Sequence, residues 1–205
     1  QVFDRGQEPS GQVDALCALA ELLLDYNGSR QEAEALLQQA HRLASETGLP
    51  EDLARHALVW GAWLQAQGRP QAAAEAWRQA LAHAERGELR MPQQEAAARL
   101  SACLAAQGDG ERACQLLQQG QTSVETLTCL RADRVLLYTH QAQRLSGDAF
   151  GAARTLERAQ GLIAHRLAYL RLPSHRQSYM QAAVVVALQR TQVHGLVDLE
   201  LDRRP

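Results

Sequence analysis

Lysine is absent from this 205-residue chain, so arginine supplies all 21 basic residues. Aromatic residues make up only 4% of the chain, and Ile163 is the one isoleucine. Because β-strands favour β-branched and aromatic residues, this scarcity excludes an all-β fold and disfavours a parallel-sheet enzyme. Without lysine, the chain can supply neither a P-loop lysine nor a Schiff-base lysine.

Motifs that commonly mark catalysis or metal binding are also missing. The sequence contains no G-x-S-x-G and no C-x-x-C, and none of its seven histidines falls in H-x-x-x-H spacing. Neighbouring carboxylates such as Glu32 and Glu34 lie at an expected helix start, where they complement the helix dipole. We therefore expect a protein without enzymatic activity, metal or other cofactor.

The cysteines and the apolar segments indicate a compartment. Cys17, Cys103, Cys114 and Cys129 lie among alanines and leucines, a setting typical of buried free thiols in a reducing cytoplasm. No segment approaches the 18 or so apolar residues of a membrane span, and residues 1–10 are too polar for a signal peptide. The chain does not begin with Met, so we expect it to be one domain of a larger protein.

Glycine marks an internal repeat. Gly28, Gly68, Gly108 and Gly147 are 40, 40 and 39 residues apart. Each is followed by alanine after five residues, a large apolar residue four later and a small residue three later: Ala33, Leu37, Ala40; Ala73, Trp77, Ala80; Ala113, Leu117, Gly120; Ala152, Leu156, Ala159. This spacing places all three on one helix face. Each unit is therefore predicted to be a helical hairpin that turns at its glycine.

The expected helices follow from this register and from the flanking Gly and Pro residues. They span 11–27 and 30–47, 51–67 and 70–86, 92–107 and 110–122, and 127–146 and 148–170. These pairs form units near 11–50, 51–90, 91–125 and 126–170, followed by a capping helix over 174–193. We expect residues 1–10 and 195–205 to be tails outside a repeat domain that spans 11–194.

The second unit resembles the tetratricopeptide repeat (TPR). Its residues at that family's signature positions are Trp60, Gly61, Leu64, Gly68, Ala73, Trp77 and Ala80. The resemblance implies an all-α right-handed superhelix of four helical hairpins and a capping helix. In the fourth unit, Thr139 and His140 replace the usual apolar and small pair. The long period resembles the sensor domains of MalT-type bacterial transcription activators.

The resemblance also implies a concave groove lined by the first helix of each hairpin. The predicted partner-binding residues are Tyr26, Arg55, Gln65, Arg131, Arg134, Tyr138, Gln141 and Arg144. Small or apolar positions complete the predicted groove, among them Leu22, Leu58, Ala98, Ala102 and Ala105, together with Glu95. The polar positions from 131 to 144 share one helix face, which we expect to be exposed, either as a solvated surface or as an anion-recognising end of the groove. Without lysine, a clamp for a C-terminal carboxylate is not expected.

Charge is unevenly distributed. Residues 1–125 hold 17 acidic residues and 10 arginines, a balance of −7, whereas residues 126–205 hold 6 and 11, a balance of +5. The asymmetry either reflects a solvated surface or gives the two ends different partners. In the second case the basic end would meet an acidic peptide, a nucleotide effector or the acidic half of another copy in a homo-oligomer.

We therefore expect a protein-interaction scaffold that binds a protein or peptide in the groove, as part of a bacterial regulator of signal transduction or transcription. One alternative is a sensor of a small molecule or nucleotide effector, and a less favoured one is a nucleic-acid-contacting repeat. Ala73 and Ala113 should be buried between helices. Trp63 is either an inter-repeat contact or a binding aromatic.

Overall fold

The computed structural model describes residues 9–26, 28–120 and 131–191, and this part of the chain is helical without strands. The helices are α1 (Pro9–Asp25), α2 (Arg30–Thr47), α3 (Pro50–Ala66), α4 (Pro70–Arg86), α5 (Arg90–Ala106), α6 (Gly110–Gly120), α7 (Ala132–Leu145), α8 (Ala149–Tyr169) and α9 (Pro173–Gln181). Predictions for residues 1–8 and 195–205 and for Cys129 lie outside the described residues. Helix α1 begins two residues before the predicted helix start at 11, and α7 begins at Ala132, while the predicted start at 127 lies outside the described residues.

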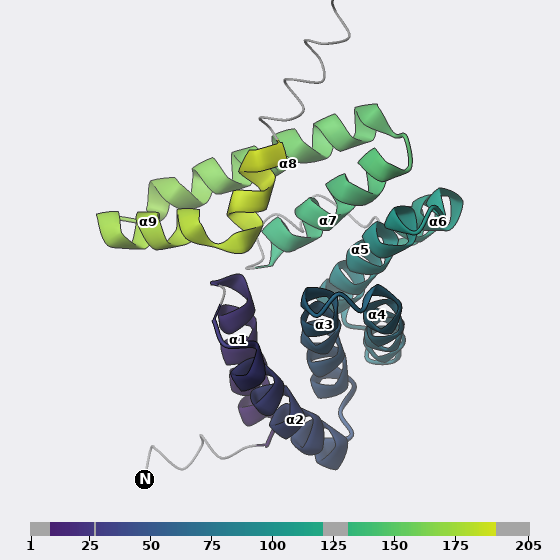
Figure 1. Ribbon diagram of the computed structural model, residues 1–205, viewed down its shortest axis with the longest axis vertical. Coiled ribbons are helices and arrows are strands. Elements are labelled where there is room, and N and C mark those ends of the chain that lie inside the picture. The colour runs from purple at the N-terminus through teal and green to yellow at the C-terminus, as the bar shows by residue number, and fades with distance from the viewer. Residues whose placement is uncertain (1–8, 27, 121–130, 192–205) are drawn as a thin grey trace, which may run out of the picture.

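The helices form four consecutive hairpins, α1–α2, α3–α4, α5–α6 and α7–α8, so the predicted all-α helical-repeat fold is confirmed (Figure 1). Neighbouring hairpins do not stack in one fixed way. Of the two helices in the preceding hairpin, α5 packs on α4 far more than on α3, whereas α7 packs on α5 far more than on α6. This change of packing brings the fourth hairpin back toward α1 (Figure 1).

Helix ends follow ordinary capping chemistry. The side chains of Ser29 and Asp148 accept backbone N–H bonds at the starts of α2 and α8. Gly48, Gly68, Gly108 and Gly147 adopt positive φ after α2, α3, α5 and α7, a conformation that side chains disfavour. Gly28 lies between α1 and α2 as predicted but is not among these left-handed glycines; in the first unit the left-handed glycine is Gly48, which ends the second helix.

The small–large–small register forms the core. Ala33, Ala73, Ala113 and Ala152 are buried, and the large residues beside them include the fully buried Leu37 and Trp77. The prediction for Ala73 and Ala113 is therefore confirmed. A Cβ at Gly61 would overlap the Trp77 indole, whose Nε1 donates to the Leu58 carbonyl. Close approach of α3 and α4 therefore requires glycine at this position.

Two of the atypical residues serve packing. Trp63 is buried, and its Nε1 donates to the Arg30 carbonyl at 3.1 Å, so it joins the first two units as an inter-repeat contact. His140 is also buried, and its Nδ1 lies 2.8 Å from the Ala152 carbonyl oxygen. In the fourth unit, a histidine that hydrogen-bonds α7 to α8 thus occupies the position where the repeat usually has a small residue.

The predicted capping helix over 174–193 is interrupted. Ala182 has a ψ of 134°, which ends α9, and a second helical segment spans 183–191. Helix α9 buries no residue, whereas Val184, Val185 and Leu188 join an apolar cluster with α7 and α8. The break separates a polar segment from the apolar run that packs. A larger apolar core spans α1–α5, and a small cluster around Ala102, Leu117 and Ala142 links the two.

Candidate functional site

The C-terminal end of α1 meets the fourth unit. Glu21 lies against Arg131, Asp25 lies against Arg134, and the Tyr26 hydroxyl donates to the Ser178 carbonyl at 3.1 Å. The first two contacts join α1 to the fourth unit across about 110 residues of sequence, and the third joins the end of α1 to α9 across 152 residues. The array therefore closes on itself, and its inner side is occupied by the side chains of its own first helices.

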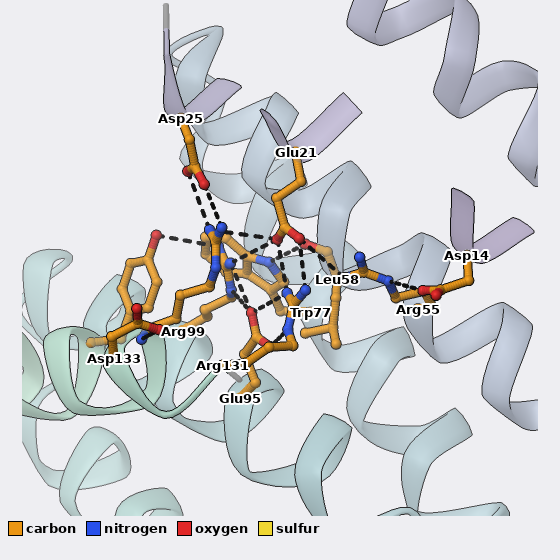
Figure 2. Close-up of polar contacts among 12 residues, drawn as sticks. Asp14, Glu21, Asp25, Arg55, Leu58, Trp77, Glu95, Arg99, Arg131 and Asp133 are labelled. Carbon is orange, nitrogen blue, oxygen red and sulfur yellow. Dashed lines mark hydrogen bonds and ion pairs between the residues drawn. The ribbon is translucent and has the colours of Figure 1, made fainter. Parts of the chain in front are cut away.

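Eight charged side chains from α1, α3, α5 and the start of α7 form what we call the arginine–carboxylate cluster: Asp14, Glu21, Asp25, Arg55, Glu95, Arg99, Arg131 and Arg134 (Figure 2). Its four carboxylates balance its four guanidinium groups. Arg131 is at the centre. It donates to both oxygens of Glu21 at 2.7 and 2.8 Å, and it also binds both oxygens of Glu95. Such two-pronged bonds suit the planar guanidinium.

The other arginines extend the cluster. The Arg99 side chain is 1% exposed; it binds Glu95 at 2.8 Å and lies over the Tyr138 ring, 4.7 Å from the ring centre. Its Nη1 donates to the Tyr138 hydroxyl at 3.2 Å. Arg55 links Asp14 at 3.0 Å to Glu21 at 3.2 Å. Every arginine in the cluster therefore has a carboxylate partner within the same chain.

The electrostatics of the cluster favour its charged form. Burial raises the pKa of Glu21, but the positive charges of Arg131 and Arg134 outweigh burial and lower that pKa to about 2. Burial also opposes ionisation of Glu95, yet Arg131 and Arg99 hold its pKa well below the ordinary range. At Asp25 burial prevails over the charge of Arg134, so its pKa is raised. Glu21 and Glu95 thus stay ionised at neutral pH.

This geometry corrects the prediction that the basic face of α7 is exposed for a partner. Arg131 and Arg134 are largely buried and paired with carboxylates of α1 and α5, and Arg55 is paired in the same way. Tyr138 is half-buried beneath Arg99. The acidic partner imagined on another copy is supplied by the acidic half of the same chain. Periodicity could show that these residues share a face but not what covers that face.

The remaining predicted groove positions divide in two. Leu58, Glu95, Ala98, Ala102 and Ala105 are buried, so they are not available to a ligand as predicted. Leu58 is covered because α4 packs against α3, and the other four are covered because α4 and α7 pack against α5. Gln65 and Arg144 are exposed, Gln141 is half-buried, and Leu22 and Tyr26 are 52% and 46% exposed.

A separate pocket of about 490 Å³ lies between α2, α3 and α4. We call it the histidine pocket. Its apolar lining consists of Leu37, Leu53, Ala57 and Trp60, and its polar lining consists of Gln38, His41, Arg42, His56, Gln79 and His83. A volume in this range, with an apolar wall and a few convergent polar groups, is typical of small-molecule sites.

Aromatic rings form one wall of the histidine pocket. The His41 and His56 ring centres are 4.9 Å apart, and the His56 ring stacks on Trp60 at 6.0 Å. Trp60 stacks in turn on Trp63 at 4.7 Å. Steps of four and three residues on α3 align the last three rings. We call this stack of rings the aromatic ladder. Trp63 at one end of it is buried and donates to the Arg30 carbonyl, so that end of the ladder is held in place.

The charge state of the pocket differs from that of the cluster. Burial and the neighbouring His41 lower the pKa of His56 to about 4, so its imidazole is neutral at pH 7. Burial and Arg86 likewise lower the pKa of His83. The His83 Nδ1 is buried without a hydrogen-bond partner, and no ion pair to Arg42 occurs in the described part of the chain. Within the described residues, the His83 Nδ1 thus lacks a hydrogen-bond partner and Arg42 lacks an ion-pair partner.

Sequence reasoning missed this site. None of the three histidines has metal-ligand spacing with another, and they come from three different helices. The sequence offered one indication of the pocket: His56 and Trp60 are four residues apart on one helix, and Arg42 lies on the helix before it. In the described ranges, no group of three His, Cys, Asp or Glu side chains could hold a metal ion.

Three further findings bear on the sequence predictions. Cys17 and Cys103 are buried free thiols as predicted, and burial raises the pKa of Cys17 to about 12, whereas Cys114 is only half-buried. Across the residues that the structure describes, no helix combines the length and apolar character needed to cross a membrane. Comparisons of the chain with protein-family models, curated proteins and solved structures found no match.

Proposed function

We propose that this chain is a non-catalytic sensor domain that binds a small molecule in the histidine pocket. The observation that carries the proposal is the pocket itself, about 490 Å³ in volume and lined by an aromatic ladder and unpaired polar groups. Perturbed titratable groups in a concave site are typical of functional positions. A cytoplasmic location in a larger bacterial regulator and the TPR-type relationship remain part of this proposal.

The arginine–carboxylate cluster supports the choice of site by contrast. A ligand on the inner side would have to displace carboxylates that are buried and doubly bonded to arginine. Breaking such a pair leaves an uncompensated buried charge, which is costly. The histidine pocket demands no such exchange, so binding there costs only the ordering of ligand and exposed side chains.

A thermal-shift screen with a small-fragment library tests the proposal. Fragments that raise the melting temperature of the wild type should lose their effect in Gln38→Trp, because the new indole would fill the pocket mouth. Gln39→Trp is the matched control, since Gln39 is the neighbouring exposed glutamine on α2 and does not line the pocket. If all stabilising fragments act equally on both variants, the ligand site lies elsewhere and the proposal is wrong.

One observation favours a protein partner as a second candidate. Leu19 and Leu22 on α1 and Tyr26 directly after it are 52%, 52% and 46% exposed. Exposed apolar stripes of this kind often mark interaction surfaces. If a partner covers this stripe, Leu19→Ser with Leu22→Ser should abolish capture of that partner by the intact regulator while leaving the melting temperature of this domain unchanged. Retained capture would exclude the stripe.

A further inference from the structure

We propose that the histidine pocket is selective for a planar, negatively charged molecule, such as an aromatic carboxylate. This inference rests on the proposed function and names the chemistry of its ligand. Three features carry it: the aromatic wall, a guanidinium among the lining residues and the absence of any carboxylate among them.

The wall selects for a flat ring. His41, His56 and Trp60 line the pocket, and Leu37, Leu53 and Ala57 add apolar residues to its lining. Aromatic groups gain from stacked or edge-on contact with such rings beyond the area that they bury. A volume of about 490 Å³ accommodates one or two fused rings but not an extended peptide.

The charges select for an anion. An aromatic wall alone would also attract a cation through the negative faces of its rings. Here Arg42 lines the same pocket, and no acidic side chain lines it to balance that charge. Arg42 is exposed and forms no ion pair with the described residues, so its guanidinium is free to take a carboxylate in a two-pronged bond.

A third group sets the orientation. His83 lies on α4, whereas Arg42 lies on α2, so a ligand between them is held from two helices. The buried Nδ1 of His83 has no partner, and a polar atom of the ligand would satisfy it. The ligand would thus place its ring on the ladder, its carboxylate toward Arg42 and a second polar atom toward His83.

Three probes that share one ring system and carry an anionic, a neutral or a cationic substituent test the inference: naphthoate, naphthol and naphthylmethylammonium. We expect isothermal titration at low and moderate salt to show naphthoate binding about tenfold more tightly than naphthol, with the ammonium weakest. Arg42→Gln should remove the preference for naphthoate and leave naphthol binding unchanged. Arg30→Gln removes the same charge from an exposed position on α2, outside the pocket, and should keep the preference.

The outcomes separate this inference from the proposed function. Equal binding of naphthoate and naphthol, or tighter binding of the ammonium, would overturn anion selectivity while a pocket that binds small molecules remains. If fragments bind in the pocket, as judged with the Gln38→Trp variant, but none of the three naphthalene probes binds, then the proposed class of planar ligands is wrong while the pocket still binds small molecules. Loss of the naphthoate preference in Arg30→Gln to the same degree would assign the effect to net charge and overturn the role of Arg42.

Discussion

The arginine–carboxylate cluster and the histidine pocket are both polar regions between helices, but they are built in opposite ways. In the cluster, each guanidinium meets a carboxylate, and Glu95 and Arg99 are almost fully buried. In the pocket, the cation Arg42 has no carboxylate beside it, and the His83 Nδ1 has no partner. Each cation of the cluster is paired with a carboxylate of the same chain, whereas the cation of the pocket is not.

This difference teaches that charge on an inner helix face is not evidence of a binding groove. The cluster joins α1 and α5 to α7, between two separate apolar cores, so its role is to hold the first and fourth units together. Satisfied polar networks rigidify a structure, whereas unpaired polar groups cost stability and persist where function requires them. Substitutions in the two regions should therefore have opposite effects on stability.

The largest effect is expected in the cluster. Glu95→Ala leaves Arg99 and Arg131 without their shared buried carboxylate, and we expect it to lower the free energy of unfolding by about 3–5 kcal/mol. Urea unfolding followed by circular dichroism measures this. Glu75→Ala breaks an exposed pair with Arg78 and should cost under about 1 kcal/mol. Similar small costs for both would show that the cluster does not hold the units together.

The pH dependence of stability should distinguish the two regions. The pKa of His56 is about 4 in the folded state against 6.5 unfolded. The unfolded chain therefore binds more protons in this window, and stability should fall by about 2–3 kcal/mol as pH drops from 6.5 to 4. His56→Asn should flatten that part of the curve in chemical unfolding at each pH. His41 and Arg42 line the same pocket and are the same residues in the wild type and in His56→Asn.

At lower pH, the carboxylates of the arginine–carboxylate cluster should determine how stability depends on pH. Glu21 has a folded pKa of about 2 against an ordinary value of 4.5, so its contribution is complete above pH 4.5 and is lost as pH falls toward 2. Because the pKa of Glu95 is also lowered, Glu21→Gln should reduce but not abolish this acid-dependent loss, and it should leave the slope between pH 6.5 and 4.5 unchanged. If Glu21→Gln flattened the curve between pH 6.5 and 4.5, or if His56→Asn removed the loss of stability at lower pH, the assignment of the two pH ranges to the two regions would be wrong.

A smaller effect of opposite sign is expected in the pocket. His83→Leu removes a buried nitrogen without a partner, and we expect it to raise the free energy of unfolding by about 1 kcal/mol. The same variant should weaken naphthoate binding. Thermal unfolding and isothermal titration on one protein preparation measure both. Loss of stability in His83→Leu would show that the ring packs as a structural element and not as a binding group.

The smallest effect is expected at Arg144, an exposed position that the sequence placed among the binding residues. Arg144→Ala should change the free energy of unfolding by under about 0.5 kcal/mol and leave naphthoate affinity unaltered. Urea unfolding and titration test both expectations. A marked loss of affinity would return the binding site to the exposed end of α7.

The sequence was sufficient to predict the hairpins because their causes are local. The register of Ala73, Trp77 and Ala80 follows from helical spacing, and the positive φ at Gly68, Gly108 and Gly147 follows from glycine's conformational freedom. Trp63 remained ambiguous until its bond to Arg30 was seen.

The site was not predictable in the same way, because it depends on contacts between distant segments. Spacing placed Arg131 and Arg134 on one face but could not reveal that Glu21 and Asp25, about 110 residues earlier, lie against them. The break at Ala182 also lacks a local glycine or proline signal. The histidine pocket combines α2, α3 and α4, so its residues never appear together in any local pattern.

The most direct test of the account is one nuclear magnetic resonance titration of the wild-type protein with naphthoate. The histidine ring C–H signals and the arginine Nε–H signals are followed together. We predict that His41, His56 and His83 shift in a saturable way along with Arg42, while Arg131 and Arg134, held by their carboxylates, do not move. Saturable shifts of Arg131 and Arg134 with unchanged histidine signals would contradict the account and place the ligand in the arginine–carboxylate cluster.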